Sequence, residues 1–160
     1  MTIFDFNTKS NTTNWRIVDD VVMGGRSNGI FKVNNSGYGE FSGTVSLENN
    51  GGFSMVQYAF ETKKVDAFNK VAMRLKGDGK TYQFRVKTTN DNRHSYTISF
   101  DTSGEWETIE IPFKQLEPAF RGRKLNMKNY PGHKMEMIAF LIGNKKAESF
   151  KLEIERIELK

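Results

Sequence analysis

Apolar and polar residues alternate along most of the chain in short runs. Residues 71–75 carry Val, Met and Leu at every second position, and residues 82–86 carry Tyr, Phe and Val in the same way. Successive side chains of a strand point to opposite faces, so this pattern is typical of strands with one buried face. The Gly-Asp-Gly sequence at 77–79 lies between the two runs. It predicts a tight turn that joins them in a hairpin.

The same alternation marks further strands, separated by turns rich in glycine, asparagine and aspartate. Phe, Val and Leu share one parity across residues 41–47, and residues 96–100 alternate after a predicted turn at 90–92. Another strand begins at Trp106 and carries Ile109 and Ile111. Pro112 falls on its opposite parity, which predicts a strand end or a sheet edge.

Two segments near the C-terminus have patterns of their own. Residues 135–142 are apolar on both parities, which predicts a central strand covered on both faces. In the final segment, 150–159, the apolar residues change parity after Ile154. This change predicts a β-bulge near Glu155 and Arg156.

Helical signals are weak, with only short turns expected at 66–70 and 114–116. At least about eight short strands without long helices predict an all-β fold, an antiparallel β-sandwich. The 160 residues fit one such domain, spanning 1–160. The longest stretch without a strand signal is 118–132, and a connection of that length is often functional or mobile.

Composition excludes several classes of chemistry. The chain has no cysteine, so disulfides, thiol nucleophiles and thiolate metal sites are excluded. Its two histidines, His94 and His133, lack metal-ligand spacing, and no catalytic constellation can be assembled. We therefore expect no metal, no cofactor and no enzymatic activity. Residues 1–10 lack a signal-peptide core and no segment has about 18 apolar residues, which predicts a cytoplasmic chain without a transmembrane segment.

The stretch W-R-I-V-D-D-V-V-M-G-G-R-S-N-G, residues 15–29, is the most unusual in the sequence. Asp19 and Asp20 form a double carboxylate that could brace its own turn, contact a partner, or hold a cation or act in catalysis. Neighbouring residues of a strand point apart, which favours the bracing interpretation. The remaining candidates in the stretch are two anchors to the core, Trp15 and Met23, two turn-shaping glycines, Gly24 and Gly25, and two contact residues, Arg26 and Ser27.

A second glycine turn follows at residues 49–53. Gly51 and Gly52 would shape it, and we expect Phe53 to belong to the core rather than to a stacking platform. Asn50 is a candidate contact residue at this turn.

The chain has a net charge of +5, and its basic residues are unevenly distributed along the sequence. Between residues 114 and 134, six basic residues accompany one acid, Glu117, and we take Arg121, Arg123 and Lys124 as candidates for an anionic partner. A solvated loop explains this segment equally well. A polar sheet face with Arg74, Gln83 and Arg85 could bind sugars or single-stranded nucleic acid, although an ordinary solvated face is the simpler interpretation.

Several motifs occur in order along nearly the whole chain. They are D-F at 5–6, Trp15, D-D-V-V-M-G-G-R-S at 19–27, F-S-G-T-V-S at 41–46, G-G-F at 51–53, G-D-G with a following Tyr at 77–82, W-x-x-x-x-I-P-F at 106–113, R-G at 121–122 and F-x-L-x-I-x-x-I at 150–157. In these motifs the chain resembles the complex I intermediate-associated protein 30 family, and D-V-V-M-G-G-R-S is the most specific of them.

The resemblance implies a galactose-binding-domain-like β-sandwich, or jelly roll. It also implies a chaperone role in complex I assembly rather than catalysis, and related folds include carbohydrate-binding modules. We therefore expect a non-enzymatic binding module that contacts a protein partner through a loop rim, formed by residues 19–27, 49–53 and 118–134. The alternatives are a carbohydrate-binding module that uses the polar sheet face and, less favoured, a domain that binds RNA or another polyanion.

Overall fold

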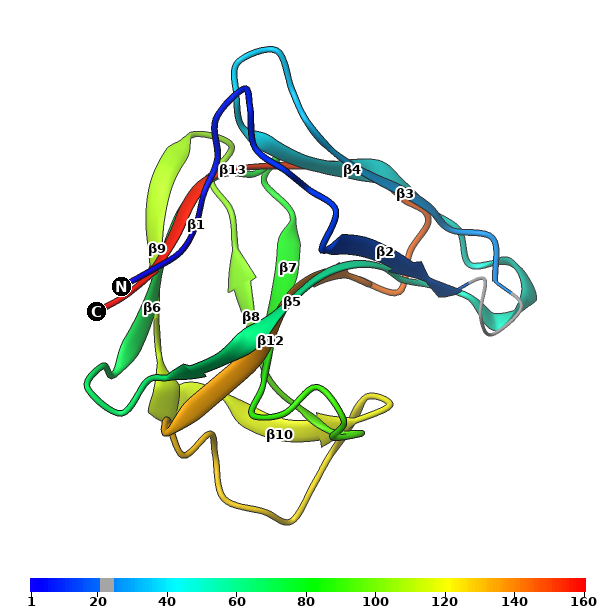
Figure 1. Cartoon of the computed structure of the whole chain (residues 1–160). Coiled ribbons are helices and arrows are strands. Elements are labelled where there is room, and N and C mark those ends of the chain that lie inside the picture. Colours follow the sequence, from blue (N-terminus) through cyan, green and yellow to red (C-terminus); the bar gives the residue numbers. More distant parts are fainter. Residues whose placement is uncertain (21–24) are drawn as a thin grey trace.

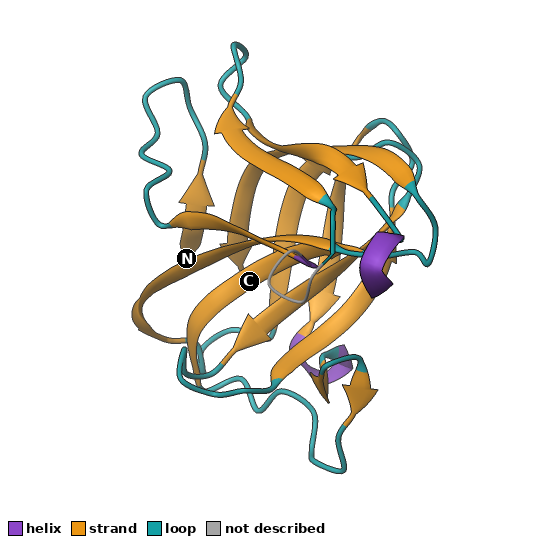
Figure 2. Ribbon diagram, turned by 90° about the vertical axis from the view of Figure 1, so that its right-hand side faces the viewer, coloured by secondary structure: helices purple, strands orange, loops and turns teal. Residues whose placement is uncertain are grey.

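The computed structural model describes residues 1–20 and 25–160, and these residues form thirteen strands in two antiparallel sheets (Figure 1). The predicted antiparallel β-sandwich is confirmed. Helix in the described residues is limited to short 3-10 turns, which include η2 (Glu48–Asn50) and η3 (Phe113–Gln115), as Figure 2 shows.

Each sheet combines strands from distant parts of the chain. The six-stranded sheet has the order β3 (Asn28–Val33), β4 (Gly39–Val45), β13 (Glu148–Leu159), β6 (Lys70–Lys76) and β9 (Trp106–Pro112), with β1 (Thr2–Asp5) also paired to β13. The seven-stranded sheet has the order β11 (Arg123–Lys124), β10 (Glu117–Phe120), β8 (Ser95–Asp101), β7 (Thr81–Lys87), β12 (Lys134–Ile142), β5 (Ser54–Lys64) and β2 (Trp15–Asp19).

The predicted hairpin between 71–75 and 82–86 is wrong, because β6 and β7 belong to different sheets. The segment 77–80 turns the corner between the sheets, where the Thr102 hydroxyl accepts from Gly79 N at 3.1 Å and donates to Lys80 O at 2.8 Å. The apolar positions of both strands are buried as predicted. Alternation identifies a buried face, but it does not identify the neighbouring strand.

Two further expectations need correction. Leu47 does not share the buried face of Phe41 and Val45, because β4 ends before it and its side chain is 45% exposed. The segment 118–132 is not free of strands, since β10 pairs with β8 and then with β11. The strand pairings in this segment are short. Strands of this length contain too few alternating apolar and polar residues to be recognised in the sequence.

Other predictions at the level of elements are confirmed. β12 lies between β7 and β5 and buries apolar residues of both parities, including Ile138 and Ala139. The register of β13 against β6 shifts between Ile154 and Arg156, where the bulge was expected. β9 ends at Pro112 and is the last strand in its sheet.

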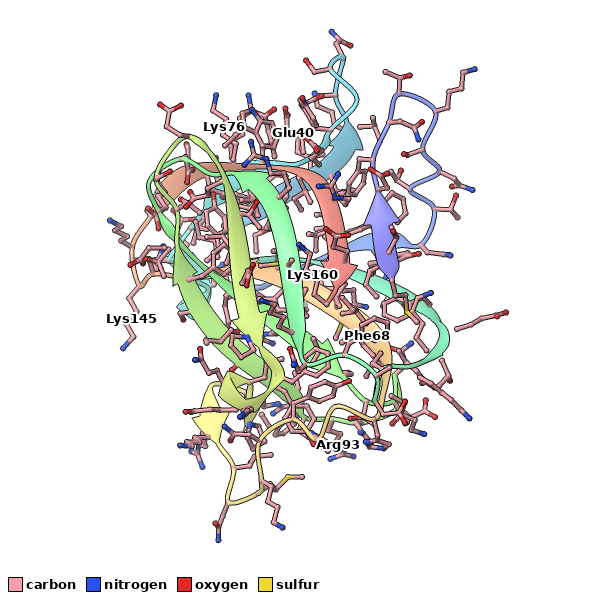
Figure 3. The ribbon with its side chains drawn as sticks, turned by 90° about the vertical axis from the view of Figure 1, so that its left-hand side faces the viewer. Glu40, Phe68, Lys76, Arg93, Lys145 and Lys160 are labelled. Carbon is pink, nitrogen blue, oxygen red and sulfur yellow. The ribbon has the colours of Figure 1, made fainter. Side chains whose placement is uncertain are left out.

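The core lies between the two sheets and includes an aromatic stack at one side. The Trp15 ring lies between Phe31 and Tyr58, with centroid distances of 4.7 and 4.8 Å. Trp15 is only 6% exposed, so it anchors β2 to the core. Charged side chains such as Lys145 project outward (Figure 3).

The two ends of the chain lie side by side (Figure 1), and Leu159 N donates to Met1 O at 2.7 Å. In the part of the chain that the structure describes, no helix has the length and apolar character needed to cross a membrane.

Candidate functional site

The outer face of the seven-stranded sheet forms a groove of about 530 Å³. Val56, Phe84 and Ile138 point into the core, and the residues that alternate with them point into the groove. In Figure 1, β2 lies at the right of the molecule and β10 at the bottom. The groove therefore crosses strands whose inner faces are already used for packing, and its size is in the range of about 300–1,000 Å³ found for ligand sites.

Strand register places a small residue in the middle of the floor. Ala139 pairs with Gln57 of β5 on one side and with Arg85 of β7 on the other. Leu141 is flanked in the same way by Met55 and Gln83. The floor is thus low in the centre and is bordered by longer side chains.

One half of the groove is apolar. Val18 of β2, Met55 of β5, and Met137 and Leu141 of β12 line it, together with Phe53. We expected Phe53 in the core, but its ring is half-buried and faces the groove. The inward position is taken by Ser54, which is fully buried, because the alternation of β5 begins at that residue.

The other half of the groove is cationic. Four basic side chains, Arg85, Lys87, Arg93 and Arg121, line it, and no acidic side chain does so among the described residues. Burial lowers the pKa of Arg85, and burial together with the charge of Arg85 lowers the pKa of Lys87. Partly desolvated cations without a paired carboxylate create a positive potential that favours an anionic ligand.

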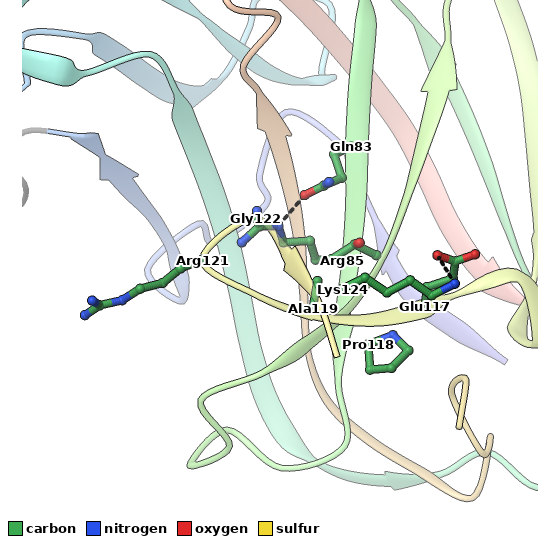
Figure 4. A pocket seen from close by; sticks show the side chains of 9 residues that line it. Gln83, Arg85, Glu117, Pro118, Ala119, Arg121, Gly122 and Lys124 are labelled. Atoms are coloured by element: carbon green, nitrogen blue, oxygen red, sulfur yellow. Dashed lines mark hydrogen bonds and ion pairs between the residues drawn. The ribbon is translucent and has the colours of Figure 1, made fainter. Parts of the chain in front are cut away.

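Arg85 is held in place by a neutral neighbour. Its Nε donates to Gln83 Oε1 at 2.6 Å, as Figure 4 shows. In the same view Glu117 is paired with Lys124, at 3.3 Å, so its charge is used outside the groove. Arg121 points away from this pair, and its guanidinium lies 5.3 Å from the centre of the Phe120 ring.

The carboxylate of Asp20 lies behind the groove edge and is only 1% exposed. Its Oδ1 accepts from Ser27 N at 2.9 Å, and its Oδ2 accepts from Ser27 Oγ at 2.5 Å, Gly52 N at 2.6 Å and Phe53 N at 3.2 Å. Burial alone would raise the pKa of Asp20, but these hydrogen bonds outweigh burial and lower it. Asp20 therefore fixes Gly52 and Phe53 at the border of the groove.

Asp19 makes a parallel set of contacts. Its Oδ2 accepts from Gly29 N at 2.9 Å, and its Oδ1 accepts from Ser54 Oγ at 2.5 Å. Ser27 is 3% exposed, and its Oγ accepts from Ser46 N at 3.0 Å. These contacts agree with the bracing interpretation, so Asp19, Asp20 and Ser27 are not included in the candidate groove.

The glycines next to Asp20 are required by close packing. A Cβ at Gly25 would lie 2.4 Å from Asp20 Cγ, and a Cβ at Gly51 would lie 2.5 Å from Asp20 Oδ2. Met23 and Gly24 lie outside the described residues.

The remaining predicted site residues are dispersed. Arg26 is exposed and lies 3.5 Å from Glu48, Asn50 ends η2, and Arg123 is exposed in β11. Lys124 lies in a smaller pocket beside the groove, and Arg121 borders both. Among the described residues, the predicted loop rim therefore reaches the groove through Gly52 and Phe53 and through residues 119–122.

The polar face proposed for sugars is divided between the sheets. Gln83 and Arg85 lie in the groove, but Arg74 belongs to β6 in the other sheet, 6.0 Å from the Trp106 ring. Sequence reasoning missed the apolar floor, which Met55, Met137 and Leu141 form. The signal was the double-sided apolar pattern of 135–142, which we assigned to packing alone.

In residues 1–20 and 25–160, no group of three or more His, Cys, Asp or Glu side chains is arranged to hold a metal ion. The groove offers cations, amides and apolar surface, which can bind and orient a ligand.

Comparison with known proteins gives one family over most of the chain. The model for complex I intermediate-associated protein 30 matches residues 4–154. The mitochondrial complex I intermediate-associated protein 30 of Mus musculus is 24% identical over 178 residues, which cover 97% of this chain and 54% of that protein. The chain thus spans about half the length of this curated relative.

Solved structures with a similar fold include carbohydrate-binding modules. A family 11 module from Clostridium thermocellum, in complex with a β-1,3-1,4-mixed-linked tetrasaccharide, has a TM-score of 0.69 at 20% identity, covering 99% of this chain and 94% of that one. The family 11 module of the Lic26A-Cel5E cellulase from the same organism has a TM-score of 0.70 at 18% identity, covering 99% and 92%. At these identities the similarity shows a galactose-binding-like sandwich fold.

Proposed function

The chain belongs to the complex I intermediate-associated protein 30 family, and on that basis we propose that it is a non-enzymatic binding module whose groove binds a protein partner. The observation that carries this proposal is the groove itself. Its apolar and cationic side chains face away from the core, and all of them except the buried Met137 are at least partly exposed and can contact a ligand. The partner class is the one that the family name suggests, a protein taken up during assembly of a larger complex.

Apolar surface in the groove supports a protein partner. Protein-binding surfaces combine an apolar centre with a polar border, and methionine and arginine are enriched there. Met55 and Leu141 supply the apolar part, and Arg85 and Arg121 supply the border.

Affinity capture from the native cell would test the proposal. Leu141→Lys places a charge in the apolar half, and we expect it to remove a partner that the unmodified protein retains. Thr44→Lys is the matched control, because Thr44 is exposed on β4 of the other sheet. Recovery of the same partner with Leu141→Lys would contradict binding in the groove, provided that both variants unfold at the same temperature as the unmodified chain.

A carbohydrate ligand is the second candidate, favoured by the partly exposed Phe53 ring in the same groove as the amides of Gln57 and Gln83. Sugar rings stack on aromatic faces and bind amides through their hydroxyl groups. A glycan panel that includes mixed-linked β-glucan would test it, with Phe53→Ala expected to abolish any binding. Absence of binding above background would remove this candidate.

A further inference from the structure

Charge and apolar surface are segregated along the groove. Most of the apolar side chains lie over β2, β5 and β12, whereas the four basic ones lie on β7 and on the loops that follow β7 and β10. Two further apolar residues, Ala119 and Phe120, line the groove from β10, beyond the basic side chains. A ligand that lies across the strands from β2 to β7 therefore meets apolar side chains first and cationic ones afterwards, which favours a ligand with an apolar part and an anionic part.

Arg85 is the best-placed group to bind the anionic end. Among the described residues its guanidinium makes one hydrogen bond, from Nε to Gln83, and no ion pair. A guanidinium carries five N–H donors in a fixed fork that matches the two oxygens of a carboxylate. Ala139 and Thr97 flank Arg85 in the register, so small side chains leave room above the fork.

The length of the groove sets the size of the ligand. It spans the strands from β2 to β10, which are five strand spacings apart in the sheet order. At about 4.8 Å for each spacing and about 3.4 Å for each residue of an extended chain, roughly seven residues cross the groove.

We propose that the groove binds an extended peptide segment of about seven residues, with a carboxylate on Arg85 and apolar side chains over Met55 and Leu141. This inference rests on the proposed function and specifies the chemistry of the partner. A neutral sugar would leave the desolvated cations without a counter-charge. A nucleic acid would repeat its negative charge along its length and would meet the apolar half with phosphate.

Selection from a random heptapeptide display library would test the proposal. We expect the recovered peptides to carry Asp or Glu toward one end and apolar residues toward the other. Arg85→Gln should weaken the best peptide by at least about tenfold, since it removes a charge-assisted bidentate contact. Exchange of the peptide's acidic residues for their amides should weaken binding to the unmodified protein by a similar factor and have little effect on Arg85→Gln.

Two control variants make the outcome specific. Lys32→Gln removes the same charge from the six-stranded sheet, where Lys32 lies 3.8 Å from Glu40, and it should leave the affinity unchanged. Arg85→Lys keeps the charge without the fork and should give an intermediate affinity. Thermal unfolding of each variant shows whether the fold is retained.

Recovered peptides without acidic enrichment, or equal affinities for Arg85→Gln and the unmodified protein, would overturn the inference. So would an oligonucleotide that binds more tightly than the best peptide and loses its affinity in Arg85→Gln. A further outcome is that Leu141→Lys abolishes capture of a protein partner while Arg85→Gln leaves that capture unchanged. In that case the groove binds a protein, as the proposed function states, but the partner segment does not place a carboxylate on Arg85. If neither variant affects capture, both proposals fail.

Discussion

The carboxylate of Asp20 connects the backbone at Ser27 to Gly52 and Phe53, which border the groove. The four donors belong to two loop segments, two of them to Ser27 and the other two to Gly52 and Phe53, rather than to a neighbouring strand. A buried acid of this kind is a structural member of the site, because it sets the position of groove residues without reaching the ligand.

Asp20→Asn tests this role. An amide has one acceptor oxygen, so its NH₂ group must face some of the N–H and O–H donors that now point at the carboxylate. We expect a loss of about 2–3 kcal/mol in the free energy of unfolding, as for hydrogen bonds to charged groups. Urea denaturation measures this loss, and Asp91→Asn, at an exposed turn, is the control that should remain within about 0.5 kcal/mol.

The same contacts predict a pH dependence. The pKa of Asp20 is lower in the folded protein than in the unfolded chain, so its contribution to stability is complete above the unfolded value of about 3.9. That contribution is lost as the pH falls through the lowered folded pKa. The stability difference between the unmodified protein and Asp20→Asn should therefore be constant above about pH 5 and shrink below about pH 4. A constant difference down to pH 2 would show that the carboxylate charge does not contribute.

At the level of elements, the close pairing of β3 and β4 depends on Gly43. Its φ is +151°, and a Cβ at this position would lie 1.9 Å from Asn28 O. The neighbouring backbone cannot give way without breaking the pairing of Gly29 with Gly43.

Gly43→Ala should therefore cost at least about 2 kcal/mol of unfolding free energy, from backbone strain and the clash together. Gly79→Ala separates these causes, since its φ is +81° and no atom lies within 4 Å of the added Cβ. We expect about 1 kcal/mol there, from the backbone conformation alone. Equal losses in the two variants, measured by thermal or urea unfolding, would show that the clash is relieved by movement of β3.

The strands also show which features of the fold the sequence predicts and which it does not. Alternation at 71–75 and 82–86 predicted which faces are buried, because burial is a property of each strand. It failed to separate the two strands into different sheets, since pairing depends on distant segments such as β12 and β13. For the same reason Arg74 was grouped with Arg85, although the two lie on opposite sheets.

At the level of the whole molecule, the groove exists only because distant strands become neighbours. Met55, Leu141 and Gln83 are separated along the chain but form one row across three strands. In the sequence, the only local sign of this arrangement is that residues 135–142 are apolar on both faces of the strand. One face of β12 packs into the core, and the other forms the floor of the groove. The sequence alone does not distinguish the two faces, because the distinction depends on the order of strands in the sheet.

The methionines provide a test of which face binds a ligand, because they are distributed over the whole molecule. Met55 and Met137 line the groove, Met73 and Met135 belong to the core, and Met1 and Met127 are exposed elsewhere. With ¹³C-labelled methionine methyl groups, the best peptide from the heptapeptide selection should shift the NMR signals of Met55 and Met137 and leave Met1 and Met73 in place.

Met→Leu substitutions assign each signal, and they conserve volume well enough to cost less than about 1.5 kcal/mol. Shifts confined to Met1 or Met127 would place the ligand away from the groove. Shifts of Met73 together with the groove methyls would indicate that binding rearranges the core between the sheets. A response limited to Met55 and Met137 is expected, because the inner faces of β5 and β12 are fully packed and transmit little movement.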